Sequence, residues 1–341
     1  MALLRRPRRS SAITGVGIYT ADLMKTLDNG SVEYKEIEMQ MDLNGGIVGA
    51  LTNGLIRPFF QILAARKDVR IFHSTDDFCC FFFPLMRNNK KVLTFHHVVS
   101  GNDGDSKPLF AWRLISWIGI RWADAIIAIS DQTCNEIVNK YGIDRNRILV
   151  VRNRLSDEYV TLGVEKKKYI GCVSTLIQRK NVDSLLRVFK EFADTYGMEE
   201  YTLKICGKGP EEAALRKLTH ALGLEDRVEF LSNLTSEEVI LFYNEASMIA
   251  NPSLHEGFGR TTLEAQLCSA PVVYFRKAEI PEEVIRFAVP AEDESDFARK
   301  MYELLTDEEL YNKVTEEGLE YARTFQGDMV EVLDLYKRLS A

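Results

Sequence analysis

The sequence predicts an α/β protein with two doubly wound parallel sheets. Its 341 residues suffice for two domains of ordinary size. Short β-rich runs alternate with helical periodicity along most of the chain, and this alternation is typical of βαβ units around a parallel sheet. Hydrophobic residues make up 46% and charged residues 27%, values that exclude wholesale disorder or a fibre.

The alternation is most regular in the second half of the chain. Five β-rich runs lie at 169–174, 201–207, 228–232, 247–253 and 271–275. Helical spacing follows the first four, at 181–196, 211–222, 236–246 and from about Thr261. Acidic helical segments close the chain near 293–305 and 307–340. These elements predict one parallel sheet covered on both faces.

The first half repeats the pattern less cleanly. Residues 69–75, 91–97, 123–130 and 148–153 favour strands, and 131–141 favours a helix capped by Ser130 or Asp131. Two such sheets indicate two Rossmann-like domains facing a central cleft, where ligands of this architecture bind. We expect domains at 1–160 and 161–325, with a C-terminal helix at 326–341 returning to the first.

Charge is distributed unevenly between the halves. Residues 1–165 carry a net charge of +3 and residues 166–341 a net charge of −10, which together give −7. An acidic total argues against a duplex-DNA binder and predicts no nucleic-acid partner. The basic first half permits a phosphate-bearing partner such as a nucleotide or an anionic lipid surface.

The six cysteines form no CxxC pair, which favours buried thiols and a reducing compartment. The arginine-rich amino terminus lacks the apolar stretch of a signal peptide, and Leu109–Ser130 is broken by charges. We therefore expect a cytoplasmic protein, with peripheral contact at the cytoplasmic membrane face left open. The histidines lack the spacing of a metal motif, so no metal site is predicted. We expect no cofactor.

The strongest motif follows the run that ends in Asn-Pro-Ser. It reads HEGFGRTTLE from His255 to Glu264 and places two carboxylates, Glu256 and Glu264, around a glycine turn and a helix start. Such a turn exposes backbone N–H groups that favour oxygen-rich ligands, and carboxylates accept hydrogen bonds from sugar hydroxyls. Alternatively, Thr261 and Glu264 form a T-x-x-E capping box. The sequence leaves both interpretations open.

Two further loops follow strands in the second half. TLIQRKN places Arg179 and Lys180 side by side, a pair suited to a diphosphate, although a solvated loop would read the same way. The Gly207-Lys208-Gly209-Pro210 turn would let the backbone approach a flat ligand such as a nucleobase, or it is a simple tight turn.

The first half offers weaker signals. Gly15 and Gly17 precede a helical run and could hold a phosphate at its start. His96 and His97 end a strand, and their alternation lets at most one of them face a given cleft.

In order, these motifs resemble the family 4 retaining glycosyltransferases (glycosyl transferases group 1), which have the GT-B fold. The resemblance spans nearly the whole chain and is strongest over 169–285, where E-x7-E runs from Glu256 to Glu264. It implies a hexosyltransferase that moves a sugar from a UDP- or GDP-linked donor to a glycan or lipid-linked acceptor. It also implies retention of anomeric configuration without a dedicated metal.

The resemblance assigns roles to single residues. Glu256 would contact the donor sugar, assisted by the backbone N–H groups of Phe258 and Gly259, and Glu264 would bind the ribose. Arg179 and Lys180 would neutralise the departing diphosphate, which Gly17 would approach from the other domain. His96 matches the histidine of the catalytic centre. The chain departs from the family pattern at Thr175, His97 and Arg154.

Residues 47–66 are mostly apolar and contain isolated basic residues. They favour a helix packed on the sheet over a segment that contacts a membrane or a lipid-linked acceptor.

Two classes of function compete with glycosyl transfer. One is another GT-B enzyme, a UDP-sugar epimerase or a phosphorylase. The other is a non-catalytic scaffold subunit, against which the intact acidic pair and Arg-Lys pair argue.

Overall fold

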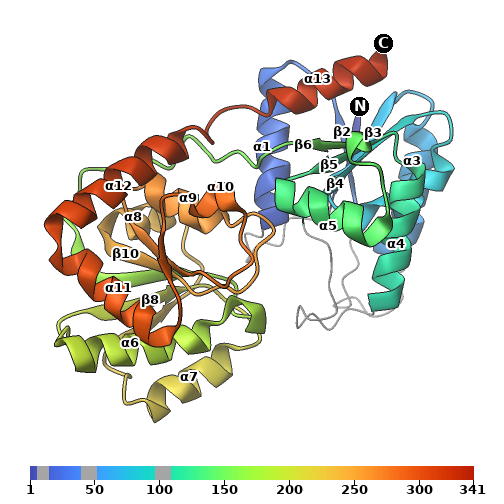
Figure 1. The fold of residues 1–341 in the computed structure, drawn as a ribbon. Coiled ribbons are helices and arrows are strands. Elements are labelled where there is room, and N and C mark those ends of the chain that lie inside the picture. Colours follow the sequence, from blue (N-terminus) through green and yellow to red (C-terminus); the bar gives the residue numbers. More distant parts are fainter. Residues whose placement is uncertain (6–14, 40–51, 97–108) are drawn as a thin grey trace. The chain divides into compact units, whose positions relative to one another are not determined.

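The computed structural model describes residues 1–5, 15–39, 52–96 and 109–341 (Figure 1). The chain divides into two compact units. One contains Met1–Arg154 together with Asp328–Ala341, and the other contains Leu155–Gly327. Each unit is built on a sheet of six described strands with parallel pairings, which confirms the two predicted doubly wound, Rossmann-like sheets.

The sheet of the first unit has the order β2-β1-β3-β4-β5-β6. Its strands are β1 (Ala2–Arg5), β2 (Lys35–Glu38), β3 (Ile71–Ser74), β4 (Lys90–Phe95), β5 (Ala125–Ala128) and β6 (Ile148–Val150). Its helices are α1 (Gly15–Asn29), α3 (Arg57–Ala65), α4 (Leu109–Trp122), α5 (Asp131–Tyr141) and α13 (Val330–Ser340), with short helical turns η2 (Thr52–Ile56), η3 (Cys79–Leu85) and η4 (Arg145–Arg147).

Local signals explain several of these elements. The Ser130 side chain accepts a hydrogen bond from the backbone of Thr133 at 3.0 Å and so caps α5, as predicted, and the left-handed Gly142 ends that helix. The sequence did not predict β2. Only Ile37 of that edge strand is buried, so it lacks a run of apolar residues.

The last helix of the chain, α13, lies against α1 (red and blue in Figure 1). The backbone N–H of Met329 donates to the Thr26 hydroxyl at 3.1 Å just before α13 begins. Three residues into that helix, the Leu333 side chain fills the space beside Gly30. The first unit therefore contains both ends of the chain.

Residues 47–66 are described from Thr52 onward. They form η2 and α3, and Ile62 and Ala65 pack into the core of the first unit while Ile56 and Phe60 are exposed. The predicted helix on the sheet is confirmed for this part, and residues 47–51 lie outside the described residues. Among the described helices, we find none that is both long and apolar enough to cross a membrane.

The sheet of the second unit has the order β12-β11-β10-β7-β8-β9. Its strands are β7 (Lys167–Val173), β8 (Thr202–Cys206), β9 (Val228–Leu231), β10 (Ala246–Asn251), β11 (Val272–Phe275) and β12 (Val289–Ala291). Its helices are α6 (Val182–Tyr196), α7 (Glu212–Ala221), α8 (Ser236–Glu245), α9 (Arg260–Leu267), α10 (Glu282–Ile285), α11 (Glu294–Thr306) and α12 (Glu308–Arg323), with the 3-10 turn η5 (Gln178–Lys180).

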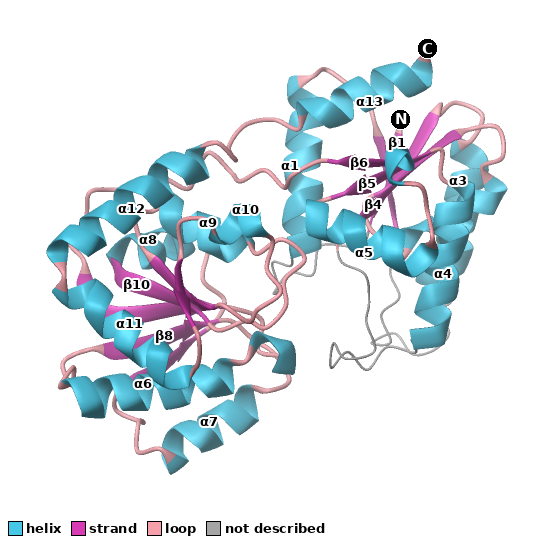
Figure 2. Ribbon diagram, in the orientation of Figure 1, coloured by secondary structure: helices cyan, strands magenta, loops and turns pink. Residues whose placement is uncertain are grey.

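Both faces of this second sheet are buried. In β7, Ile170 packs toward the side of α6 and α11, and Tyr169 toward the side of α8 (Figure 2). In β10, Met248 packs on the side of α6 and α11, and Ile249 packs on the side of α8. Strand alternation thus gives two apolar layers, which explains the near-continuous hydrophobic runs in the sequence. All six cysteines are buried free thiols, as predicted.

Candidate functional site

The candidate site lies at the carboxyl edge of the second sheet. After β7 the chain proceeds outward to β8 and β9, and then β10 returns to the other side of β7. Strand order therefore reverses between β7 and β10, and such a switch point is where open α/β sheets bind ligands. The TLIQRKN loop follows β7, and the HEGFGR loop follows β10.

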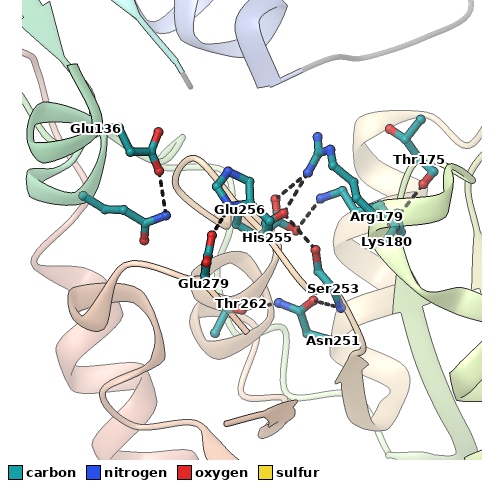
Figure 3. Close-up of polar contacts among 12 residues, drawn as sticks. Glu136, Thr175, Arg179, Lys180, Asn251, Ser253, His255, Glu256, Thr262 and Glu279 are labelled. Carbon is teal, nitrogen blue, oxygen red and sulfur yellow. Dashed lines mark hydrogen bonds and ion pairs between the residues drawn. The ribbon is translucent and has the colours of Figure 1, made fainter. Parts of the chain in front are cut away.

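Arg179 and Lys180 both reach the Glu256 carboxylate (Figure 3). The Lys180 ammonium forms an ion pair with Glu256 Oε1, and Arg179 Nη1 lies 3.7 Å from Oε2. Arg179 Nη1 also donates to the backbone carbonyl of His255 at 2.8 Å. Glu256 is 7% exposed. The structure thus brings three predicted site residues into one charged cluster.

The electrostatics of this cluster follow from its charges. Burial alone would raise the pKa of the Glu256 carboxyl, but Lys180 and Arg179 oppose it. Their charges, with hydrogen bonds from Lys180 and Ser253, hold that pKa below its ordinary value. Glu256 is therefore ionised at neutral pH and accepts hydrogen bonds.

Backbone contacts hold the two loops together. The N–H of Leu254 donates to the carbonyl of Arg179 at 3.0 Å, and the Asn181 side chain donates to the carbonyl of Pro252 at 3.2 Å. Asn181 adopts a left-handed conformation (φ 54°) between η5 and α6. The charged side chains therefore project from fixed backbone rather than from independent loops.

A third loop, after β11, supports the site and was not predicted. Glu279 accepts a hydrogen bond at its backbone carbonyl from the N–H of Glu256 at 2.9 Å, and its own N–H donates to Leu254. Its carboxylate lies 3.0 Å from His255 Nδ1 (Figure 3). Glu279 lies in the loop after a different strand, so no spacing within a motif could have revealed it.

The glycine turn and the start of α9 settle one open alternative. Gly259 has φ 91° and is the N-cap of α9, so the helix begins at Arg260 and Thr261 lies inside it. The T-x-x-E capping box is therefore wrong. A Cβ at Gly259 would also stand 3.3 Å from Ile280 and Val284. The neighbouring Phe258 ring is buried against Phe325.

Glu264 has its own partners one turn into α9. Arg260 Nε lies 3.2 Å from Glu264 Oε1, and the Tyr243 hydroxyl donates to Oε2 at 3.3 Å. Tyr243 is fully buried, and burial, with the nearby Glu264 charge, raises its pKa well above the ordinary value. It therefore remains a neutral donor. The i, i+4 spacing of Arg260 and Glu264 could have revealed one of these partners; Tyr243 lies on α8 and gave no signal.

The Gly207–Pro210 turn packs against the TLIQRKN loop. A Cβ on Gly207 would stand 1.7 Å from the carbonyl oxygen of Ser174, and one on Gly209 would stand 2.1 Å from that of Leu176. The backbone approach that the sequence predicted for a ligand is thus made here to the neighbouring loop. Pro210 lies in the turn that leads into α7.

The predicted residues of the first unit lie at the start of α1 and directly after β4. Gly15 and Gly17 lie in the first turn of α1, which therefore begins before the predicted helical run. His96 follows β4, is 8% exposed, and donates from Nε2 to the Thr75 carbonyl at 2.8 Å. His97 lies outside the described residues.

Family models match most of the chain. The model described as "Glycosyl transferases group 1" matches residues 157–321, and "Glycosyltransferase Family 4" matches residues 49–158. Among curated proteins, a D-inositol 3-phosphate glycosyltransferase of Corynebacterium jeikeium is 29% identical over 70% of this chain and 62% of its own length. The O-antigen chain mannosyltransferase RfbU of Salmonella typhimurium is 26% identical over 56% of this chain and 52% of its own. The chain thus spans less than two thirds of these relatives.

Solved structures share the fold. HepE of Anabaena, crystallised with UDP and glucose, has a TM-score of 0.76 at 16% identity, covering 100% of this chain and 99% of HepE. A sucrose-phosphate synthase of Thermosynechococcus elongatus has a TM-score of 0.79 at 14% identity, covering 99% of this chain and 98% of the other. At these identities the likeness concerns the GT-B fold alone.

Proposed function

Because this chain belongs to the family 4 glycosyltransferases (glycosyl transferases group 1), we propose that it transfers a sugar from a nucleoside diphosphate sugar to a hydroxyl group. The donor is UDP- or GDP-linked, the acceptor is a glycan or a lipid-linked molecule, and the anomeric configuration is retained. The observation that carries this proposal is the cluster of Arg179, Lys180 and Glu256 at the point where strand order reverses.

The charges of the cluster suit this chemistry. When a sugar leaves a nucleoside diphosphate, negative charge grows on the diphosphate, and fixed cations stabilise that state more than the ground state. Lys180 and Arg179 are already positioned by Glu256 and by the His255 carbonyl. The Glu256 carboxylate, ionised at neutral pH, accepts hydrogen bonds from donor-sugar hydroxyls.

Further residues have roles in the proposed transfer. The Glu264 carboxylate, oriented by Arg260 and Tyr243, accepts the ribose hydroxyls. The N–H groups of Phe258 and Gly259 assist at the sugar, Gly15 and Gly17 contribute to diphosphate binding, and His96 acts in the transfer step. Transfer needs no dedicated metal in this proposal. The UDP bound to HepE supports UDP as the first nucleotide to examine.

The first unit supplies the acceptor side. Two helices of this unit expose apolar side chains: Ile56 and Phe60 lie just before and within α3, and Leu114 and Trp117 lie on α4. These side chains support a lipid-linked acceptor and peripheral contact with the cytoplasmic membrane face. If the wild-type protein binds vesicles of anionic lipid and Phe60→Ser binds them more weakly, this part of the proposal is supported. Equal binding of both proteins opposes it.

A panel of UDP- and GDP-sugars tests the proposal. Wild-type protein should release nucleoside diphosphate from one donor, and NMR of the product should show the anomeric configuration of the donor. Lys180→Met and Glu256→Gln should lose most of this activity, by roughly 100-fold or more. Lys190→Met, which alters an exposed lysine of α6, should not.

Each competing function has its own outcome in this assay. An epimerase would give an isomerised sugar, and a phosphorylase would give sugar phosphate. Product formation that survives both Lys180→Met and Glu256→Gln, in a complex with an active transferase, would favour a scaffold. The family matches do not favour these alternatives.

A further inference from the structure

A chain of buried polar groups connects the C-terminal helix to the strand end that carries His96. The Tyr336 hydroxyl, on α13, is hydrogen-bonded to His73 Nδ1 on β3. His73 Nε2 lies 2.7 Å from the Thr94 hydroxyl on β4, which in turn lies 3.1 Å from the Tyr19 hydroxyl on α1. Four elements of the first unit thus meet through three consecutive hydrogen bonds.

The end of this chain contacts His96. The Tyr19 ring packs edge-on against the His96 ring, with 4.8 Å between their centroids and 84° between their planes. His96 is also held by a second contact, the hydrogen bond that its Nε2 donates to the Thr75 carbonyl at 2.8 Å. A neutral imidazole that donates from Nε2 presents Nδ1 as its acceptor. The position of the Tyr19 ring therefore limits where that nitrogen points.

Burial makes this arrangement a fixed one. Tyr19, His73 and Thr94 are each 0% exposed, and Tyr336 is 5% exposed. Burial, followed by an electrostatic contribution from His96, lowers the pKa of His73 to about 3, and burial raises the pKa of Tyr19 to about 12. All members are neutral near pH 7, so each hydroxyl and ring nitrogen needs its neighbour as a hydrogen-bond partner.

Core packing alone does not call for these residue types. Leucine or phenylalanine would fill the same volume without the cost of burying four polar groups. The network joins His96 to a helix more than 230 residues further along the chain. Of its members, Tyr19 packs its ring against the ring of His96, and His73 also interacts with His96 electrostatically.

We propose that Tyr336, His73 and Thr94 are positioning residues that hold the Tyr19 ring and thereby orient His96 toward the reacting sugar. This inference rests on the proposed function, because it takes His96 to act at the transfer site. It assigns α13 a part in orienting that histidine as well as in closing the fold of the first unit.

Histidine ring NMR on the full-length protein tests the positioning directly. The ¹H–¹⁵N spectra of the ring nitrogens distinguish the two tautomers of each of the five histidines, and His96→Gln assigns the His96 signal. In Tyr336→Phe and Thr94→Val we expect the signals of both His73 and His96 to shift. Thr94→Ser, which keeps the hydroxyl, should retain the wild-type His96 signal.

Two controls separate positioning from general destabilisation. Glu331→Gln removes the ion pair of α13 with Arg154 but leaves the network intact. Tyr311→Phe removes a tyrosine hydroxyl bonded to the Ser247 carbonyl in the second unit. Neither should move the His96 signal. A His96 signal that stays unchanged in both Tyr336→Phe and Thr94→Val, or that moves equally in the controls, overturns the proposal.

Kinetics with the donor test the consequence for transfer. Tyr336→Phe should lower kcat roughly 10-fold, because a misplaced catalytic group slows the chemical step, and change the donor KM less than about 2-fold. A raised KM with unchanged kcat contradicts the inference. If wild-type protein transfers no sugar, the proposed function fails, and the NMR arm still decides whether the network orients His96.

Discussion

Lys180 and Glu256 form an ion pair although 76 residues separate them in the sequence. The pair connects the loop after β7 to the loop after β10, at the position where the order of strands reverses. Their side chains are only 14% and 9% exposed, so little solvent screens the interaction. Most of what we expect of this protein depends on that pair.

The first prediction concerns the strength of this ion pair. Lys180→Met or Glu256→Gln alone should each destabilise the protein, by about 3 kcal/mol, because each leaves a largely buried charge without its main partner. The double variant should lose less than the sum, with a coupling energy of about 1–3 kcal/mol. Denaturant unfolding of the four proteins measures this.

The exposed pair of Lys190 and Asp194 on α6 is the matched control for that cycle. Its coupling energy should stay below about 0.5 kcal/mol. Equal coupling energies in the two cycles would mean that the buried pair is only a surface-like contact.

The second prediction concerns the glycine turn after β8. Gly207→Ala should destabilise the second unit and abolish donor turnover, because its Cβ would collide with the Ser174 carbonyl oxygen at 1.7 Å. Gly223→Ala, where φ is +67° and the space is open, should cost only about 1 kcal/mol. Thermal unfolding and donor hydrolysis compare the two variants. Similar losses in both would show that backbone conformation, and not loop contact, selects glycine at Gly207.

The third prediction concerns the orientation of Glu264. Tyr243→Phe and Arg260→Leu each remove one partner of this carboxylate, and both should weaken nucleotide binding by roughly 10-fold. Calorimetric titration with UDP and GDP gives the dissociation constants. Tyr169→Phe, which removes another buried hydroxyl bond of the same unit, is the control and should bind as wild type. Unchanged nucleotide affinity in both test variants would mean that the orientation of Glu264 does not contribute to nucleotide binding.

The fourth prediction concerns pH and the buried His73. Its pKa is about 3 in the folded protein and about 6.5 in an unfolded chain. Below about pH 6.5 the unfolded state therefore binds a proton that the folded state does not, and stability falls as pH falls. At pH 5 this loss is about 2 kcal/mol relative to pH 7.5.

His73→Gln removes that titration. Whatever the variant loses at pH 7.5, it should lose about 2 kcal/mol less at pH 5, as measured by urea unfolding at both pH values. If the free energy of unfolding changed equally with pH in the wild-type protein and in His73→Gln, His73 would have to take up a proton in the folded state.

The second unit was predictable because its chemistry lies at strand ends. Each motif there follows an apolar run, and parallel strands bring their carboxyl ends to one edge, so Arg179, Lys180 and Glu256 could be expected near one another before the fold was known. The particular ion pairs among these side chains could not be predicted from the sequence. They depend on β10 lying beside β7 rather than at the edge of the sheet.

What the sequence did not reveal is of two kinds. Strands β2 and β12 are short edge strands, and β12 contains a proline, so neither has the apolar alternation that indicates a strand. Glu279, Tyr243 and Tyr336 are partners supplied by other elements of the fold. The capping box at Thr261 fitted local rules and was wrong, because Gly259 adopts the left-handed conformation and caps α9 two residues earlier.

A crystal structure of the full-length protein with UDP or GDP tests the central claim most directly. The account predicts the diphosphate within hydrogen-bonding distance of Arg179 and Lys180, and the ribose hydroxyls on the Glu264 carboxylate. A nucleotide bound away from the carboxyl edge of β7 and β10, in a protein that still transfers sugar from that donor, would contradict it.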